Sequence, residues 1–239
     1  MEKPSYKQLL DAGVHFGHMK RKWNPKMAPY IFMEKKGIHI IDLNRTSEHL
    51  ENAATALKQM AKSGKKIMFV ATKKQAREII TKAATSVNMP FVTDRWLGGM
   101  MTNFATIRRS VKKMQNIEKM LTDTSITSIT KKERLTLSRE KERMEKVLGG
   151  VANLNRLPNA IFIVDIHHEH LALAEAEKLG IKTFAMVDTN SDPNKVDFAI
   201  PANDDASKSI SIITNYLVSA IQEGLSERKE VKAKEEETN

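Results

Sequence analysis

Two hydrophobic patterns divide this chain. Short, nearly continuous apolar runs of the kind found in buried strands alternate with longer segments in which apolar residues recur every three or four positions, as on one face of a helix. The predicted strands are Ile67–Ala71, Pro90–Val92, Ala160–Val164, Thr183–Val187 and Phe198–Pro201. The predicted helices run from Thr46 or Ser47 to Lys62, then over Lys73–Val87, Glu169–Leu179 and Ala206–Gly224, the last capped near Asp204-Asp205. Strands that alternate with helices predict an α/β fold, a doubly wound parallel sheet with helices on both faces.

The N-terminal part of the chain precedes this alternation. A short helix is predicted over Tyr6–Ala12, and two short strands over Pro29–Met33 and Ile38–Leu43. Residues 13–27 show neither a helical nor a strand period, so they are predicted to form an ordered loop on the surface of the α/β domain.

A long helical segment interrupts the alternation in the middle of the chain. Thr130 and Glu133 form a capping box that opens the second of two helices, and its apolar stripe is as narrow as that of a two-stranded coiled coil. The pattern therefore predicts a helical coiled-coil hairpin over residues 103–157, inserted between two parts of one α/β domain, 1–102 and 158–226. Residues 227–239 have almost no apolar side chains and are expected to be disordered or a frayed helix.

Charge narrows the classes of partner. The 239 residues carry 39 Lys and Arg against 29 Asp and Glu, a net charge of +10, which favours nucleic acid or an anionic membrane surface. The absence of cysteine excludes disulfides and thiolate chemistry and fits a reducing cytoplasm. No apolar run approaches the roughly 20 residues of a membrane span, and no amphipathic segment opposes an apolar face to a polybasic one. We expect a soluble cytoplasmic protein.

Two basic segments are candidates for contact with a polyanion. In the loop 13–27, four cations are interleaved with rings that can stack on unpaired bases, and the alternative is a solvated basic loop above buried aromatics. In the hairpin, cations outnumber carboxylates about two to one, which fits either a clamp on phosphates or a solvated protrusion. The cations of the two segments are Lys20, Arg21, Lys22 and Lys26, and Arg108, Arg109, Lys112, Lys113 and Lys119.

A third candidate is the stretch Asp94–Asn103, which joins the α/β pattern to the hairpin. Gly98-Gly99 permits unusual backbone angles, and Asn103 is a good N-cap for the helix that follows. One interpretation is a structural elbow with Trp96 in the core. The other is an elbow whose Arg95 and open glycine backbone touch a polyanion.

An enzyme is the rival class, because doubly wound folds bind ligands at the carboxyl ends of their strands. Asp165 and Asp188 follow two such strands, and with Asp205 they could serve a metal-dependent enzyme. The region after the first buried strand, however, lacks the glycines of a phosphate-binding loop. A divalent ion could also bind among Asp188, Asp192, Asp197, Asp204 and Asp205, with His15 or His18 joining from afar, although turn and cap chemistry explains the same carboxylates.

Several of these stretches also carry a family resemblance. Their order and spacing from Ser5 to Gly224 resemble the bacterial form of the S-two family of small-subunit ribosomal proteins. The matching stretches are Gly13–His18, Trp23–Met27, Ile38–Leu43, Arg95–Asn103, Leu148–Gly150 and Asp188–Pro193.

The resemblance implies a flavodoxin-like sheet with a protruding coiled-coil hairpin and a structural role in the cytoplasmic ribosome without enzymatic activity. It implies contact with small-subunit ribosomal RNA and neighbouring ribosomal proteins, help in anchoring protein S-one, no membrane and no homo-oligomer. The RNA-binding candidates it supplies are Lys20, Arg21, Lys22, Trp23, Lys26, Arg95, Asn103, Arg108, Arg109, Lys112 and Lys113. No cofactor is required, and the candidates for a structural zinc ion near the S-one contact are His18, Asp188, Asp204 and Asp205.

Overall fold

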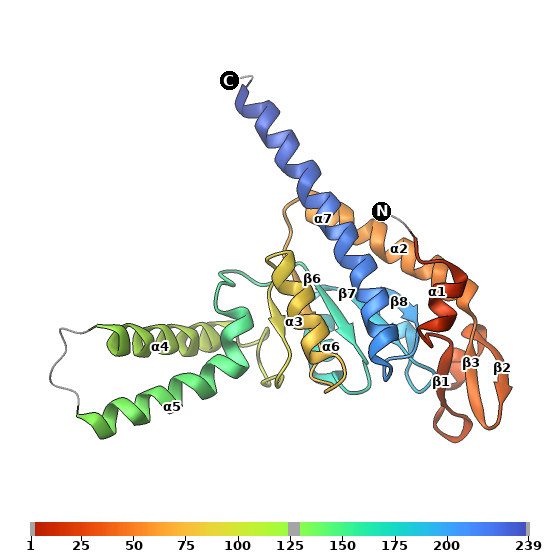
Figure 1. Ribbon diagram of the computed structural model, residues 1–239, viewed down its shortest axis with the longest axis horizontal. Helices are drawn as coiled ribbons and strands as arrows, with labels where there is room; N and C mark the ends of the chain where they lie inside the picture. The colour runs from red at the N-terminus through yellow and green to blue at the C-terminus, as the bar shows by residue number, and fades with distance from the viewer. Residues whose placement is uncertain (1–2, 124–129, 238–239) are drawn as a thin grey trace.

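The computed structural model describes residues 3–123 and 130–237, and its centre is a five-stranded parallel sheet (Figure 1). In the sheet the strands lie in the order β5-β4-β6-β7-β8. Taken by their appearance along the chain this is the order 2-1-3-4-5, which defines the flavodoxin-like doubly wound fold and confirms the predicted fold class. The bounds are Ile67–Val70 for β4, Phe91–Val92 for β5, Ala160–Val164 for β6, Lys182–Val187 for β7 and Phe198–Pro201 for β8.

Alternate side chains of each strand enter two different apolar layers. In β4, Ile67 and Phe69 pack in one layer with the buried faces of three helices, whereas Met68 and Val70 pack in the other with α6 and the segment that leads to α4. The ring of Phe69 meets that of Phe162 edge to face at 5.7 Å in the first layer. That layer is covered by α2 (Leu43–Lys62), α3 (Arg77–Ser86) and α7 (Ser207–Glu237), and the second by α6 (His170–Leu179).

A small antiparallel sheet lies at one end of the molecule and corrects the prediction of a plain loop over 13–27. Its strands, in the order β1-β3-β2, are Phe16–Met19, Ile38–Ile41 and Ile31–Lys35. The sequence of β1 has no strand period, and contacts with a distant part of the chain hold this strand in place. Gly17 has no room for a side chain beside Thr189, and the His18 amide donates to Thr189 Oγ1 at 2.8 Å. The short helix α1 (Tyr6–Asp11) is capped by Ser5, close to the predicted bounds.

The helical hairpin consists of α4 (Phe104–Thr122) and α5 (Lys131–Leu148), which lie side by side and project away from the sheet (Figure 1). One side of α4 is buried at Ile107, Val111, Met114 and Ile117. The Thr130–Glu133 capping box is confirmed. The coiled-coil character of the hairpin and the domain bounds at 103 and 157 stay predictions.

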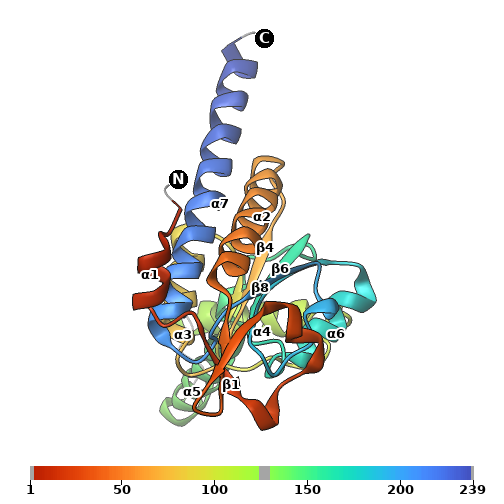
Figure 2. The same ribbon diagram turned by 90° about the vertical axis from the view of Figure 1, so that its right-hand side faces the viewer.

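The caps of two helices differ from the prediction. α2 begins one turn earlier, because Asp42 rather than Thr46 or Ser47 accepts from a free amide, that of Asn44, at 2.9 Å. In the turn before α7, Asn203 Oδ1 accepts from the amides of Asp205 and Ala206, whereas Asp204 and Asp205 pair with Lys73 and cap no amide of α7 among the described residues. In Figures 1 and 2, α7 continues past the end of α2, and its helix extends to Glu237, through the segment for which disorder or a frayed helix is expected.

Among the described helices, none is both long and apolar enough to cross a membrane.

Candidate nucleic-acid interface

The structure separates the predicted RNA-binding residues into two groups at opposite ends of the molecule. The first group lies on and beside the small sheet, and the second lies on the hairpin, with the five-stranded sheet between them (Figure 1). The elbow with Arg95 and Asn103 is at the base of the hairpin. The predicted RNA-binding residues therefore do not form a single continuous basic surface.

At the small-sheet end, some of the predicted cations are engaged within the protein. Lys20 pairs with Glu34 at 2.6 Å and Lys26 with Asp192 at 2.6 Å. Within residues 3–123 and 130–237, Arg21 and Lys22 have no ion-pair partner, and both are exposed in a 3-10 turn that follows β1. Trp23 is 37% exposed, and its ring lies 5.2 Å from that of the buried His39, so only one part of the indole is open to a ligand.

At the elbow, the glycine backbone is occupied by an internal anion. The carboxylate of Glu175 on α6 accepts from the amides of Gly99 at 2.7 Å and of Met101 and Thr102 at 2.9 Å each, and from the Trp96 indole at 3.0 Å. Burial acts to raise the pKa of Glu175, but these donors outweigh it and lower the pKa, so the carboxylate is charged. The Gly99 amide is therefore not open to an outside anion, and the packing of Trp96 in the core is confirmed. Contact of the exposed Arg95 and Gly98 with a polyanion stays a prediction.

The two predicted contact residues of the elbow differ in their surroundings. Arg95 is exposed and lines a hollow of about 410 Å³ with Arg77, Trp96 and His168. Asn103 stands at the N-cap position of α4, but its Oδ1 accepts from the Thr106 hydroxyl at 2.9 Å and makes no side-chain cap to the backbone. The predicted capping bond is thus replaced by a side-chain contact.

Of the four hairpin cations that the resemblance supplies as RNA-binding candidates, two are exposed and have no ion-pair partner in the part of the chain that the structure describes. Arg108 is half-buried and donates to the Leu154 carbonyl at 2.9 Å, so it ties the returning chain to α4, and Lys113 pairs with Glu140 of α5 at 2.6 Å. In the described part of the chain, Arg109 and Lys112 are exposed and have no ion-pair partner. Arg109 and Lys112 therefore form a second exposed basic site, on α4.

The crevice where a flavodoxin-like fold would bind its ligand is filled by the protein itself. It lies at the carboxyl ends of β4 and β6, where the strand order reverses. Lys73 Nζ is 2.9 Å from Asp165 and 2.7 Å from each of Asp204 and Asp205, while the amide and hydroxyl of Thr72 donate to Glu169. Burial lowers the pKa of Lys73, but the three carboxylates outweigh it and raise that pKa.

The predicted metal candidates gather beside this lysine. His18 Nδ1 is 3.1 Å from Asp188 and Nε2 is 3.5 Å from Asp205, and the potential ligand atoms of His18, Asp188 and Asp204 lie within 4.8 Å of one another. Burial and the neighbouring carboxylates of Asp188 and Asp165 raise the pKa of Asp204 to about 7. Of the other proposed members, His15 and Asp197 are not in the group: Asp197 binds Lys182 and Thr183, and Asp192 binds Lys26.

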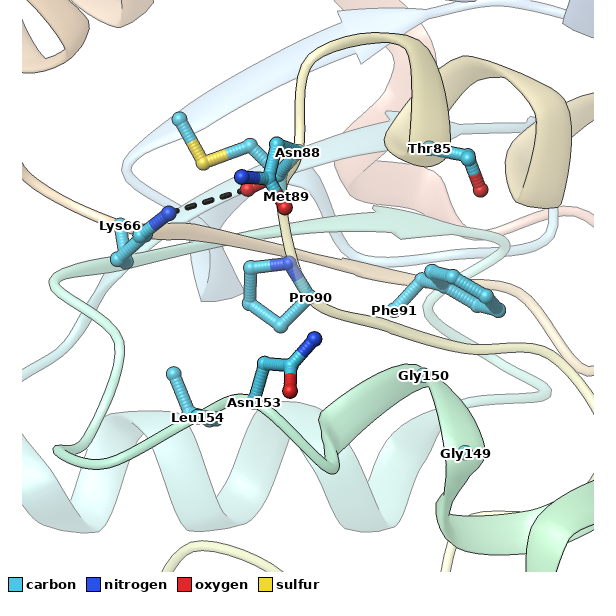
Figure 3. Close-up of a pocket in the computed structure, with 10 residues that line it drawn as sticks. All are labelled: Lys66, Thr85, Asn88, Met89, Pro90, Phe91, Gly149, Gly150, Asn153 and Leu154. Atoms are coloured by element: carbon cyan, nitrogen blue, oxygen red, sulfur yellow. Dashed lines mark hydrogen bonds between the residues drawn. The ribbon is translucent and has the colours of Figure 1, made fainter.

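A separate hollow of about 410 Å³ lies at the base of the hairpin and contains none of the predicted site residues (Figure 3). Lys66 lies at one side of it and donates to the Asn88 carbonyl at 3.0 Å, and Gly149 and Gly150 lie on the opposite side. An added Cβ on Gly150 would overlap the carbonyl oxygen of Phe91, so this glycine is required for close packing of the hairpin base.

The sequence did not reveal the roles of Lys73 and Glu175, which hold the crevice and the elbow together. Lys73 was assigned only to the start of a helix, and Glu175 only to the middle of one. Their partners lie about 70 to 130 positions away in the chain, so no local pattern could have revealed them. The one signal in the sequence was Lys73 itself, because it follows a buried strand at the place where a phosphate-binding protein would have a glycine loop.

A basic α/β protein whose ligand crevice is closed by its own ion pairs, and whose free cations lie on outlying elements, has the features of a structural protein rather than of an enzyme. Comparison with known proteins gives the family: the model of the family "Ribosomal protein S2" matches residues 9–224, and the chain belongs to this family.

Curated relatives agree over almost the whole chain. The small ribosomal subunit protein uS2 of Cytophaga hutchinsonii is 63% identical and covers 99% of this chain and 94% of its own length. Those of Flavobacterium johnsoniae and Phocaeicola vulgatus are 58% and 57% identical over 96% of this chain, which corresponds to 92% and 82% of their own lengths. The chain is thus a structural constituent of the small ribosomal subunit, and the alternative of a metal-dependent enzyme is excluded.

Proposed function

We propose that the protein binds small-subunit ribosomal RNA at two separate places, one on each end of the molecule. The observation that carries this proposal is the set of cations that lie at both ends of the molecule, are exposed, and have no ion-pair partner among the described residues: Arg21 and Lys22 beside β1, and Arg109 and Lys112 on α4. Cations that are not neutralised by the protein release counterions when they meet phosphates, whereas paired ones such as Lys113 gain less. Contacts of this kind recognise folded RNA by its shape and backbone.

Reversal of charge on the hairpin tests the proposal. The double variant Arg109→Glu/Lys112→Glu is expected to weaken binding to naked small-subunit RNA by about tenfold or more, and to reduce the dependence of affinity on salt by about one unit per lost contact. Arg108 is left intact because its bond to Leu154 supports the hairpin base. Filter binding at several salt concentrations measures both quantities.

The control keeps the same change in net charge. Lys178→Glu/Lys229→Glu reverses two exposed cations on α6 and α7, away from both proposed contacts. Equal weakening by the two double variants would mean that net charge alone governs binding, and the localised contact on α4 would be rejected.

We also propose that the outer face of the small sheet anchors protein S-one, as the resemblance implies. The register places Phe16, Ile40 and Met33 in one row across the sheet and Met19, Ile38 and Lys35 in the next, so Lys35 borders the apolar residues at one edge. Phe16, Met19, Met33 and Ile38 are 37–48% exposed. A contiguous exposed apolar face of this kind is typical of a protein interface.

The expected result is that Met33→Asp weakens the binding of purified S-one by about tenfold, since an unpaired charge enters an apolar contact. Leu171→Asp is the matched control, because Leu171 is similarly exposed, at 49%, but lies on α6. A pull-down titration with both variants measures the effect. Equal binding of Met33→Asp and the unaltered protein would place the anchor elsewhere.

We further propose that His18, Asp188 and Asp204, with Asp205 beside them, can hold a structural zinc ion. Imidazole nitrogen and carboxylate oxygen are zinc ligands, and among the described buried atoms Asp204 Oδ2 is one without a hydrogen-bond partner. Such an ion would fix β1 against the carboxyl edge of the large sheet, where Gly17 and His18 already touch Thr189.

Zinc at 100 times its dissociation constant is expected to stabilise the protein by about 2.7 kcal/mol, because it binds only the folded chain. His18→Ala should abolish this gain, whereas His167→Ala, which removes an exposed imidazole outside the cluster, should retain it. Thermal unfolding with zinc and with a chelator measures the difference. A stabilisation that survives His18→Ala would reject this ligand set.

A further inference from the structure

Glu175 makes more hydrogen bonds to the elbow than one carboxylate in a surface helix ordinarily makes. Its Oε1 accepts from the Trp96 indole and the Gly99 amide, and its Oε2 accepts from the amides of Met101 and Thr102 and from the Thr102 hydroxyl, all at 2.7–3.0 Å. Several backbone amides that converge on one anion form a nest, and here the anion belongs to the protein.

These bonds act on the segment that sets the direction of the hairpin. Met101 and Thr102 are the last residues before Asn103, from which α4 begins. Gly99 has a φ of 87°, so the chain turns there through the left-handed region that glycine permits. The carboxylate therefore lies on the inside of the turn that joins the sheet to α4.

The structure assigns Glu175 as the positioning residue that fixes the hairpin relative to the α/β body, so that Arg109 and Lys112 meet the RNA in one orientation. This inference rests on the proposed RNA-binding function. Glu175 touches no RNA itself, since its two oxygens are used within the protein.

Apolar side chains of the outgoing chain, such as Met101 and Ile107, also pack in the core, and further contacts tie the returning chain to the hairpin base. Arg108 donates to Leu154, which follows α5, and Gly150 packs against Phe91. Among the described side chains, Glu175 is the one that binds the backbone between Trp96 and α4. Loss of its charge leaves three amides and the buried indole of Trp96 facing an inadequate acceptor.

The test measures the orientation of the hairpin directly. The chain has no cysteine, so Lys82→Cys on α3 and Gln115→Cys on α4, both at exposed positions, give a unique pair of spin labels between body and hairpin. In the free protein we expect one narrow distance distribution with Glu175 and a broadened or shifted one with Glu175→Gln. Glu175→Asp keeps the charge but withdraws the carboxylate by one methylene, and it should give an intermediate result. Glu177→Gln makes the same chemical change at an exposed position of the same helix and should leave the distribution unaltered.

RNA affinity supplies the second readout. Glu175→Gln is expected to weaken RNA binding by about tenfold, equivalent to about 1.4 kcal/mol, although it removes no cation. An unchanged distance distribution in both Glu175 variants would overturn the inference, whatever their affinity. A changed distribution together with RNA binding that neither Glu175→Gln nor Arg109→Glu/Lys112→Glu weakens would uphold Glu175 as the residue that fixes the hairpin and overturn the proposed RNA contact on α4.

Discussion

Replacement of Lys73 by methionine is expected to lower the free energy of unfolding by about 3–5 kcal/mol, the range found when one partner is removed from a buried ion pair. Lys73 is bonded to Asp165, Asp204 and Asp205 at 2.7–2.9 Å, and the first two carboxylates are buried. Methionine matches the apolar stem of lysine and lacks its ammonium group. The variant therefore loses the cation and leaves the buried carboxylates facing one another.

Urea unfolding in the presence of a chelator measures this loss without a contribution from bound metal. Lys74→Met is the matched control, because Lys74 is the next residue, is exposed, and has no ion-pair partner in the described chain. Its effect should stay within about 0.5 kcal/mol. If both variants unfold at the same urea concentration, the ion pairs of the crevice contribute nothing to stability.

The Lys73 cluster also explains how an enzyme-like fold serves a structural purpose. The doubly wound fold brings the ends of β4, β6 and β8 together, and in many enzymes this edge receives a phosphate or a cofactor. Here Lys73 after β4 pairs with Asp165 after β6 and Asp204 after β8, so its positive charge is neutralised within the protein and is not available to a ligand. The cations left for a partner are those outside the sheet, such as Arg21 and Arg109.

Hydrophobic periodicity was sufficient to predict most of the sheet. Strands β6 and β8 have the predicted bounds, and β4, β5 and β7 differ by one residue at an end, because buried parallel strands are continuous apolar runs that glycine, proline or aspartate bounds. β1 could not be predicted in the same way. Its sequence, Phe16–Met19, is apolar and polar in no regular order, and it pairs because Ile38–Ile41 and Thr189 are nearby in space.

The candidate site was predictable as a set of residue types but not as an arrangement. Net charge and the basic segments predict contact with a polyanion, and this stays a prediction. The structure shows that Lys20, Lys26 and Lys113 are paired and that Arg108 is bonded to a carbonyl. Whether a cation is free depends on carboxylates distant in sequence, such as Asp192 for Lys26. The same reason concealed Glu175, whose bonds to the elbow span more than 70 residues.

The two glycines at the end of α5 lead to the second large expected effect. Gly150→Ala should lower the free energy of unfolding by about 3 kcal/mol, at the upper end of the cost of overpacking, because the new methyl group meets the backbone carbonyl and the ring of Phe91. Neither atom group can move freely, since the Phe91 strand β5 is paired to β4.

Gly149→Ala is the matched control, and it should have little effect or a small stabilising one. Its Cβ would lie 3.5 Å from Glu145 Cγ, an ordinary contact, and its φ of −56° suits alanine, which loses less entropy on folding than glycine. Urea unfolding of the two variants measures the contrast. The two predictions differ in sign because Gly150 faces β5 and Gly149 does not. Equal stability of the two variants would mean that the hairpin base can shift away from Phe91, and the close packing that restrains the chain returning from α5 would have to be abandoned.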